Sequence, residues 1–315
     1  MTRYVLESAA REFAYTAAQS PFVYQMTVPR ARTVLESIQA APIHKPEVDS
    51  SWIVVVVDGV SCRTRIVRPP GWTRPLPVVL YLHGGGWVLG SAGTHDRLVR
   101  EIAVGVPAAV AFVDYERAPE ARYPRALEQA YAVARWIWHD GADWALDPSR
   151  MAVAGDSAGG NLAAALMLLA RRRGEVQFVH QSLYYPVTDA SCDTDSYREF
   201  ADGPHLTART MAWFWDAYVP DSALRDEVTV SPLRATAEQL AGLPPAFIVV
   251  GEYDVLRDEG EAYARNLTDA GLRCSSVRYS STFHDFMMLN ALRTTSAATE
   301  AIDQAIRVLQ RTLHS

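Results

Sequence analysis

The pentapeptide Gly-Asp-Ser-Ala-Gly at residues 155–159 follows a short apolar run and precedes a long apolar segment. A G-x-S-x-G sequence between a strand and a helix is typical of a turn that presents a nucleophilic serine. The chain must reverse within a few atoms of Ser157, so larger side chains at Gly155 and Gly159 would collide. We therefore predict that Ser157 is a nucleophile at a helix N-terminus, in preference to a glycine-rich turn without a chemical role.

A serine hydroxyl is a weak nucleophile and needs a base, which in turn needs an acid to orient it. In folds that present a nucleophilic serine on this kind of strand-to-helix turn, the order along the chain is serine, acid, histidine. Of the downstream histidines, His180 lies in an apolar run, His205 in a region without strands, and His314 beside the C-terminus. His284 directly follows the last predicted strand, at the edge of the sheet, and is predicted to be the base.

The acid is expected just after the strand that precedes this one. Four carboxylates follow that strand, namely Glu252, Asp254, Asp258 and Glu259. Asp258 and Glu259 fit the first turn of the next helix, where the helix dipole favours acids. Asp254 lies on the loop itself and is predicted to orient the base.

Three adjacent glycines at 84–86 follow another apolar run and His83. Attack on an ester carbonyl creates an oxyanion, which preorganised N–H groups stabilise. One such donor is the N–H of the residue after the nucleophile, Ala158, and the others come from the loop after the third strand, where these glycines fall. A phosphate-binding loop is excluded because neither G-K-[ST] nor G-x-G-x-x-G is present.

Short apolar segments alternate with helical patterns through most of the chain, which predicts a mostly parallel sheet with helices on both faces. A β-branched hairpin at 52–59 and 62–70 precedes the alternation. The further strands are expected at 78–83, 109–114, 151–155, 179–185, 246–251 and 274–279. Helices are expected near 95–105, 124–139, 157–173, 258–270 and 291–313.

Two regions depart from this alternation. The first 45 residues read as helical pieces broken by prolines, and residues 187–232 contain no clear strand. Together they are expected to form a lid over the sheet. The predicted organisation is N-terminal cap helices at 1–45, a first core part at 46–186, a cap insertion at 187–232 and a second core part at 233–315.

The composition is that of an ordinary soluble globular protein, with 315 residues, 49% hydrophobic and 21% charged. A net charge of −6 offers no basic surface for nucleic acid. Cys62, Cys192 and Cys274 are too far apart for a metal site or a disulfide framework. Glu7 and Arg11 interrupt the apolar core that a signal peptide needs, and no apolar run reaches the length of a membrane span. We expect a cytoplasmic protein without cofactor or metal.

The HGGGW sequence at 83–87 and the GDSAGG sequence at 155–160 resemble the hormone-sensitive lipase family of α/β-hydrolases, in particular its bacterial carboxylesterases and acetyl-hydrolases. Further matching segments are DYERAPE (114–120), SPLRA (231–235), EYDVLRDEGEAYA (252–264) and FHDF (283–286). The resemblance implies an α/β-hydrolase fold with eight strands and a helical cap. It also implies a triad of Ser157, Asp254 and His284, and oxyanion donors at Gly85, Gly86 and Ala158.

Three positions depart from the family pattern. Glu116-Arg117 replaces the usual Arg-Leu, the segment 121–124 is less apolar than usual, and Asp285 stands where the family usually has glycine. None of these changes removes a predicted triad member. Asp285 adds a charge beside the base and therefore bears on the base or on the rim of the pocket.

The predicted activity is hydrolysis of short- to medium-chain carboxylic esters through an acyl-enzyme on Ser157. The chain-length preference rests on the family resemblance. The alternatives are an amidase or N-acetyl hydrolase with the same triad, and a non-catalytic ligand-binding protein, which would be expected to lose a triad residue. A homodimer through the last strand is a further expectation. The candidate pocket residues are Trp87, Tyr185, Trp213, Phe214, Trp215, Tyr218, Phe283 and Met287.

Overall fold

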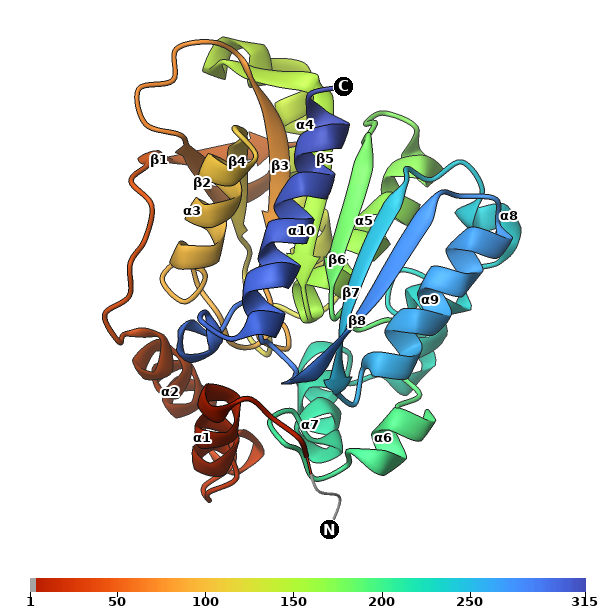
Figure 1. The fold of residues 1–315 in the computed structure, drawn as a ribbon. Helices are drawn as coiled ribbons and strands as arrows, with labels where there is room; N and C mark the ends of the chain where they lie inside the picture. The colour runs from red at the N-terminus through yellow and green to blue at the C-terminus, as the bar shows by residue number, and fades with distance from the viewer. Residues whose placement is uncertain (1–3) are drawn as a thin grey trace.

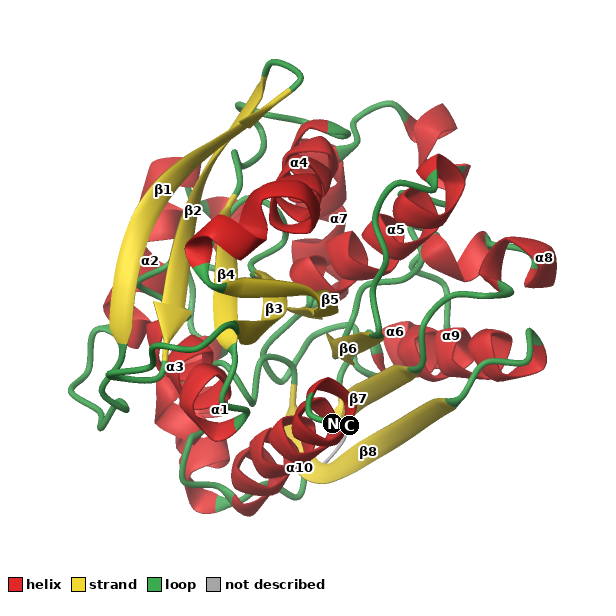
Figure 2. Ribbon diagram, turned by 90° about the horizontal axis from the view of Figure 1, so that it is seen from above, coloured by secondary structure: helices red, strands yellow, loops and turns green. Residues whose placement is uncertain are grey.

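A computed structural model describes residues 4–315 and contains one eight-stranded sheet between two layers of helices (Figures 1 and 2). The strands lie in the order β1-β2-β4-β3-β5-β6-β7-β8. Only β2 runs antiparallel to its neighbours, so the predicted hairpin supplies the single reversed strand. The strand bounds are β1 Asp49–Val57, β2 Val60–Arg68, β3 Leu76–Leu82, β4 Ala109–Asp114, β5 Leu146–Asp156, β6 His180–Tyr184, β7 Ala246–Tyr253 and β8 Cys274–Phe283.

The predicted helices of the core are all present in the described part of the chain. They are α3 Asp96–Gly105, α4 Arg125–Asp140, α5 Ala158–Arg173, α9 Arg257–Asp269 and α10 Ser296–Leu313. The other helical elements are α1 Ser8–Ala17, η1 Val23–Gln25, α2 Val28–Gln39, η2 Gly141–Trp144, α6 Asp195–Glu199, α7 Ala208–Tyr218, η3 Ser222–Asp226, η4 Pro232–Arg234, α8 Ala237–Leu240 and η5 Asn290–Leu292.

The strand boundaries differ from the prediction mainly in β5, which begins five residues earlier than expected. Asp147 and Pro148 are residue types typical of turns, which hides the strand before Met151 from a reading of the local sequence. In the fold this segment pairs with the start of β3, and the register shifts at Pro77. Tertiary pairing thus overrides the local turn signal.

The central strand β3 shows why the sheet is buried on both faces. Its residues are all buried, and they divide by alternation between two apolar clusters. Val78 and Leu80 pack on the side of α4, α5 and α9, whereas Val79 and Tyr81 pack on the side of α3 and α10. A continuous apolar run is the pattern expected of a parallel strand covered from both sides.

The helical segments α1, α2, α6 and α7 lie together at the end of the sheet where the parallel strands finish (Figure 1). Arg32 of α2 links this region to the core. Its guanidinium donates to the carbonyls of Val88 (2.8 Å) and Ala118 (3.0 Å) and pairs with Glu120 (2.7 Å). The N-terminal helices are therefore attached to the loop that carries the three glycines.

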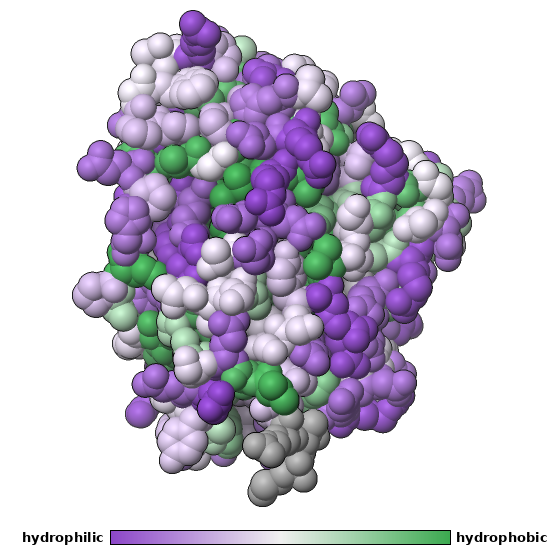
Figure 3. All heavy atoms as spheres, viewed as in Figure 1, coloured by the Kyte–Doolittle hydropathy of each residue, from purple (hydrophilic) through white to green (hydrophobic). Residues whose placement is uncertain are grey.

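The surface seen in Figure 3 is mostly hydrophilic, with hydrophobic residues in small separate patches. Within residues 4–315, none of the helices combines the length and the apolar character needed to span a bilayer.

Candidate active site

The turn around Ser157 joins β5 to α5 and places the serine in a conformation that few residues adopt. Its backbone has φ 54° and ψ −120°, and α5 begins at the next residue, Ala158. A Cβ atom at Gly155 would collide with the backbone carbonyl of Gly159, and one at Gly159 would collide with the carbonyl of Leu82. The two glycines are therefore needed for the close approach of three backbone segments, as the sequence suggested.

The hydroxyl of Ser157, the imidazole of His284 and the carboxylate of Asp254 form one continuous hydrogen-bonded series. His284 Nε2 lies 2.8 Å from Ser157 Oγ, and His284 Nδ1 lies 2.7 Å from Asp254 Oδ2. Asp254 also accepts a bond from the backbone N–H of Leu256 (3.0 Å), which fixes its carboxylate. All three side chains are buried. The loops after β5, β7 and β8 thus place the three predicted residues in mutual contact.

The imidazole of His284 has a strongly altered affinity for protons. Burial disfavours its charged form, but the carboxylates of Asp254 and Asp285 outweigh burial and raise its pKa to about 9. Asp254 alone bonds to Nδ1, so Nε2 is the nitrogen that faces the Ser157 hydroxyl. The arrangement favours proton transfer from the hydroxyl to this nitrogen.

A buried polar network lies beneath the nucleophile and supports the glycine loop. Asp156 accepts bonds from the Tyr81 hydroxyl (2.7 Å) and the Gly84 backbone N–H (3.1 Å), and its other oxygen lies 3.1 Å from His95 Nε2. Burial lowers the pKa of His95, but Asp156 more than compensates and raises it. None of Asp156, Tyr81 and His95 was among the predicted site residues. The acid beside the nucleophile and the buried position of Tyr81 in β3 were the available signals.

The glycine loop crosses the mouth of the site with its backbone exposed to the cavity. Gly85 has φ 104° and Gly86 has φ 60°, both in the region that favours glycine. A Cβ atom at Gly86 would collide with the ring of Phe214. Among residues 4–315, no hydrogen bond engages the N–H groups of Gly85 and Gly86, which leaves them available to an anionic oxygen.

A cavity of about 310 Å³ opens onto Ser157 and His284, between the glycine loop and the cap segments. Most of its lining comes from the N-terminal segment 13–38, which includes α1, η1 and α2, and from the segment 205–214, which runs into α7. The lining residues are Phe13, Thr16, Ala17, Gln19, Pro21, Phe22, Val23, Met26, Ala31, Val34, Leu35, Ile38, Gly85, Gly86, Leu89, Ser157, His205, Leu206, Thr210, Phe214, His284 and Asp285. The cavity is therefore largely apolar away from the reacting groups.

The prediction for the pocket residues is mostly wrong, because only Phe214 lines this cavity. Trp87 instead stacks on Tyr218 (ring centroids 4.4 Å apart) and packs against Trp215 (4.5 Å), forming a core beneath the loop. These large aromatic side chains pack in the core and do not line the cavity, as is usual for large apolar residues. The predicted residues that do not reach the cavity are Trp87, Tyr185, Trp213, Trp215, Tyr218, Phe283 and Met287.

The cap residues that do line the cavity were missed, although α2 carried a signal. Ala31, Val34, Leu35 and Ile38 recur at spacings of three, one and three, which is the pattern of one apolar helix face. That face covers the cavity. The N-terminal helices were expected to form a lid, and the apolar face of α2 marked a buried side without indicating that it would face the nucleophile.

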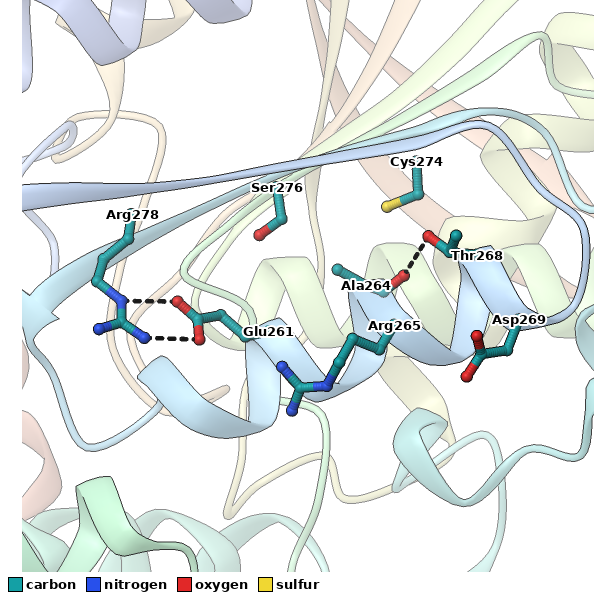
Figure 4. A pocket seen from close by; sticks show the side chains of 8 residues that line it. All are labelled: Glu261, Ala264, Arg265, Thr268, Asp269, Cys274, Ser276 and Arg278. Carbon is teal, nitrogen blue, oxygen red and sulfur yellow. Dashed lines mark hydrogen bonds and ion pairs between the residues drawn. The ribbon is translucent and has the colours of Figure 1, made fainter.

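A second hollow of about 490 Å³ lies between α9 and β8 and is shown in Figure 4. Glu261 accepts two bonds from Arg278 across it, both 2.7 Å, and Thr268 bonds to the carbonyl of Ala264 within α9. These polar groups have hydrogen-bond partners within the protein. The hollow is not lined by Ser157, His284 or Asp254. Across the described residues, no cluster of three or more His, Cys, Asp or Glu side chains could hold a metal ion.

The fold and this hydrogen-bonded series of serine, histidine and aspartate define the class of α/β-hydrolases. A family model described as alpha/beta hydrolase fold matches residues 79–288, and the chain belongs to this family. The match is in agreement with the resemblance and the fold expected from the sequence.

Individual relatives extend over almost the whole chain. The carboxylesterase NlhH of Mycobacterium tuberculosis is 39% identical over 287 residues, covering 90% of this chain and 89% of the relative. An ethyl acetate hydrolase of Pseudomonas putida is 34% identical, covering 87% and 86%. Among solved structures, a thermostable esterase from Pseudomonas putida ECU1011 superposes with a TM-score of 0.97 at 41% identity, covering 99% of both chains.

Proposed function

We propose that this protein is a serine carboxylesterase that hydrolyses short- to medium-chain esters through an acyl-enzyme on Ser157. The observation that carries the proposal is the hydrogen-bonded series of Ser157, His284 and Asp254 at the floor of an apolar cavity. Relatives named as esterases, at up to 39% identity over most of the chain, support the reaction class.

In the first half of the proposed reaction, Ser157 Oγ attacks the ester carbonyl while His284 Nε2 takes the hydroxyl proton. The carbonyl oxygen becomes an oxyanion that accepts bonds from the N–H groups of Gly85, Gly86 and Ala158. The imidazolium then gives its proton to the departing alkoxide, and the alcohol leaves. Asp254 holds the imidazole orientation and stabilises its charge throughout.

In the second half, water replaces the alcohol. His284 takes a proton from the water as its oxygen attacks the acyl carbonyl, and a second oxyanion forms in the same place. Its collapse expels Ser157 Oγ, which recovers the proton from His284, and the carboxylic acid is released. Each half thus uses the same base and the same backbone donors, and no external redox partner is required.

The chain-length preference follows from the size and character of the cavity. At about 310 Å³ it lies near the lower end of the roughly 300–1,000 Å³ typical of small-molecule pockets. An acyl chain of moderate length fills this volume, and each buried methylene contributes about 0.8 kcal/mol until the space is used. Longer chains would have to displace the cap.

The test is a panel of p-nitrophenyl acetate, butyrate, octanoate and palmitate, with the anilide matched to the best ester. We expect the highest kcat/KM among the shorter esters, a far lower rate for the anilide, and labelling of Ser157 by a fluorophosphonate. Ser157→Ala is expected to lose several orders of magnitude of turnover and all labelling. Labelling at another residue would refute the assignment, and an anilide rate matching the ester rate would identify an amidase.

The domain organisation and cellular setting belong to the same proposal. Residues 1–45 and 187–232 act as the cap over a core formed by 46–186 and 233–315. This division is supported by the cavity lining, which draws on both cap segments. A cytoplasmic location fits the three cysteines, all of which are free thiols. A homodimer would pair through β8, one of the two edge strands, and sedimentation of the purified protein tests it.

A further inference from the structure

A second carboxylate lies beside the nitrogen of His284 that faces the nucleophile. Asp285 Oδ1 is 3.4 Å from His284 Nε2, and the same nitrogen is 2.8 Å from Ser157 Oγ. Asp285 follows β8 at the turn that presents His284, with φ 66°. The reacting nitrogen therefore faces both the hydroxyl that it must deprotonate and a carboxylate within ion-pair distance.

The Asp285 carboxylate is otherwise poorly satisfied for a group with only 14% of its side chain exposed. Within residues 4–315, Oδ1 is buried and accepts no hydrogen bond. Oδ2 lies 3.5 Å from Nε2 of His205, which belongs to the cap insertion. His205 in turn packs edge-on against Phe13 of α1, at 5.2 Å between ring centroids. Asp285 thus stands between the base and both cap segments.

The charges around this pair determine which protonation states are favoured. Burial raises the pKa of the Asp285 carboxyl, but His284 and His205 outweigh burial and lower it, so the group remains ionised. The titratable groups that face His284 and Asp285 from the surrounding elements are Asp156, Asp254, His95, His205 and Tyr185, and the charged Arg97 lies near Tyr185. Of these, Arg97 is neutralised by Glu101 at 2.6 Å, and His95 is paired with Asp156.

We infer that Asp285 is a positioning residue that acts through His284. It holds the protonated imidazole by its Nε2–H and so moves the pH range in which the enzyme is active upward. His205, which belongs to the cap insertion, weakens this effect of Asp285. The inference rests on the proposed function. Family members with glycine at this position lack the second carboxylate, so the role inferred for Asp285 does not extend to them.

For the reaction, this means that Asp285 and the Ser157 hydroxyl compete for the same nitrogen, His284 Nε2. In the resting enzyme at lower pH, the Nε2–H of the imidazolium donates to Asp285, and the base cannot accept the Ser157 proton until that proton is lost to solvent. Only neutral imidazole acts as a base, so activity follows the deprotonation of His284. An opposite charge within about 4–6 Å moves such a deprotonation by about one to three pH units.

The decisive variant is Asp285→Asn, because asparagine tolerates a positive φ and keeps the shape of the side chain. The measurement is kcat/KM for p-nitrophenyl butyrate between pH 5 and pH 10, with melting temperature recorded for each protein. We expect the rising limb to move down by about one unit or more, with activity retained on the plateau. Asp195→Asn, at a surface carboxylate with 86% of its side chain exposed, is the control and leaves the limb unchanged.

Asp285→Gly guards against a folding failure of the first variant, since glycine also suits the backbone. His205→Ala is expected to move the rising limb to higher pH in the wild-type background. It is expected to have no effect when Asp285 is already asparagine. This difference would show that His205 acts through Asp285. A limb that coincides with that of the wild type in both Asp285 variants overturns the inference, even if KM changes. A wild-type protein without esterase activity would instead overturn the proposed function.

Discussion

Arg32 offers a test of how the N-terminal cap controls the glycine loop. Replacement by alanine removes the donor from two carbonyls, those of Val88 and Ala118, which belong to residues that are 0% and 1% exposed. A buried acceptor that loses its partner costs about 1–3 kcal/mol. The ion pair with Glu120 adds little, because 62% of the Glu120 side chain is exposed. We therefore expect Arg32→Ala to lower the free energy of unfolding by about 3 kcal/mol.

The corresponding fall in melting temperature follows from the size of the chain. Unfolding entropy amounts to about 2.1 cal/mol/K per residue, or about 0.7 kcal/mol/K for 315 residues. A loss of about 3 kcal/mol then lowers Tm by about 4 °C. Because Val88 is two residues from Gly86, freeing its carbonyl also loosens the loop that carries the proposed oxyanion donors. We expect kcat to fall by about tenfold, a fraction of the roughly 10²–10³ that one donor contributes.

Calorimetry and ester hydrolysis on Arg32→Ala and on Glu120→Gln distinguish the two partners. The second variant removes only the exposed ion pair and is expected to change stability by less than about 1 kcal/mol, with kcat unaltered. If both variants lose the same stability and the same activity, the backbone contacts of Arg32 have no special importance and the reasoning is refuted. A loss of stability without any loss of kcat would show that the loop is held by its own contacts.

Two further variants test the site itself. Gly86→Ala places a Cβ atom into the ring of Phe214 and a side chain at a positive φ, so the loop or the ring must shift; kcat is expected to fall by about 10²–10³ with KM little changed, measured on a short ester. Gly174→Ala, also at positive φ but with open space around it, should leave kcat alone and refutes the steric reasoning if it does not. Phe214→Ala enlarges the cavity and should raise the ratio of octanoate to acetate kcat/KM by about tenfold, at a stability cost of about 3 kcal/mol. Trp213→Ala, which does not line the cavity, is the comparison, and an equal change there would contradict the lining.

The core of the fold could be predicted because its elements carry strong local signals. Runs such as 78–82 and 109–113 are short and apolar at every position, which is the pattern of a strand covered on both faces. The short loops after β5, β7 and β8 then left few places for Ser157, Asp254 and His284 other than one edge of the sheet. Their mutual distances were nevertheless a prediction, since spacing along the chain does not specify side-chain direction.

The lining of the cavity could not be predicted in the same way. Trp87 and Phe214 are both large and apolar, and nothing local separates the one that packs beneath the loop from the one that faces the substrate space. That distinction depends on how α1 and α2 dock, through contacts such as those of Arg32, 56 residues away from Val88 in sequence. Long-range docking of this kind leaves no periodic signal in the chain.

The position of α10 has a practical consequence for attaching the protein to a support. This helix ends at Leu313, at the end of the sheet opposite α1, α2 and α7 (Figure 1). Anchoring through a tag placed after residue 315 would therefore orient the cap and the cavity beneath it toward the bulk liquid. An anchor attached beside α1 would place the resin against the cap, where it would hinder diffusion of esters into an immobilised catalyst.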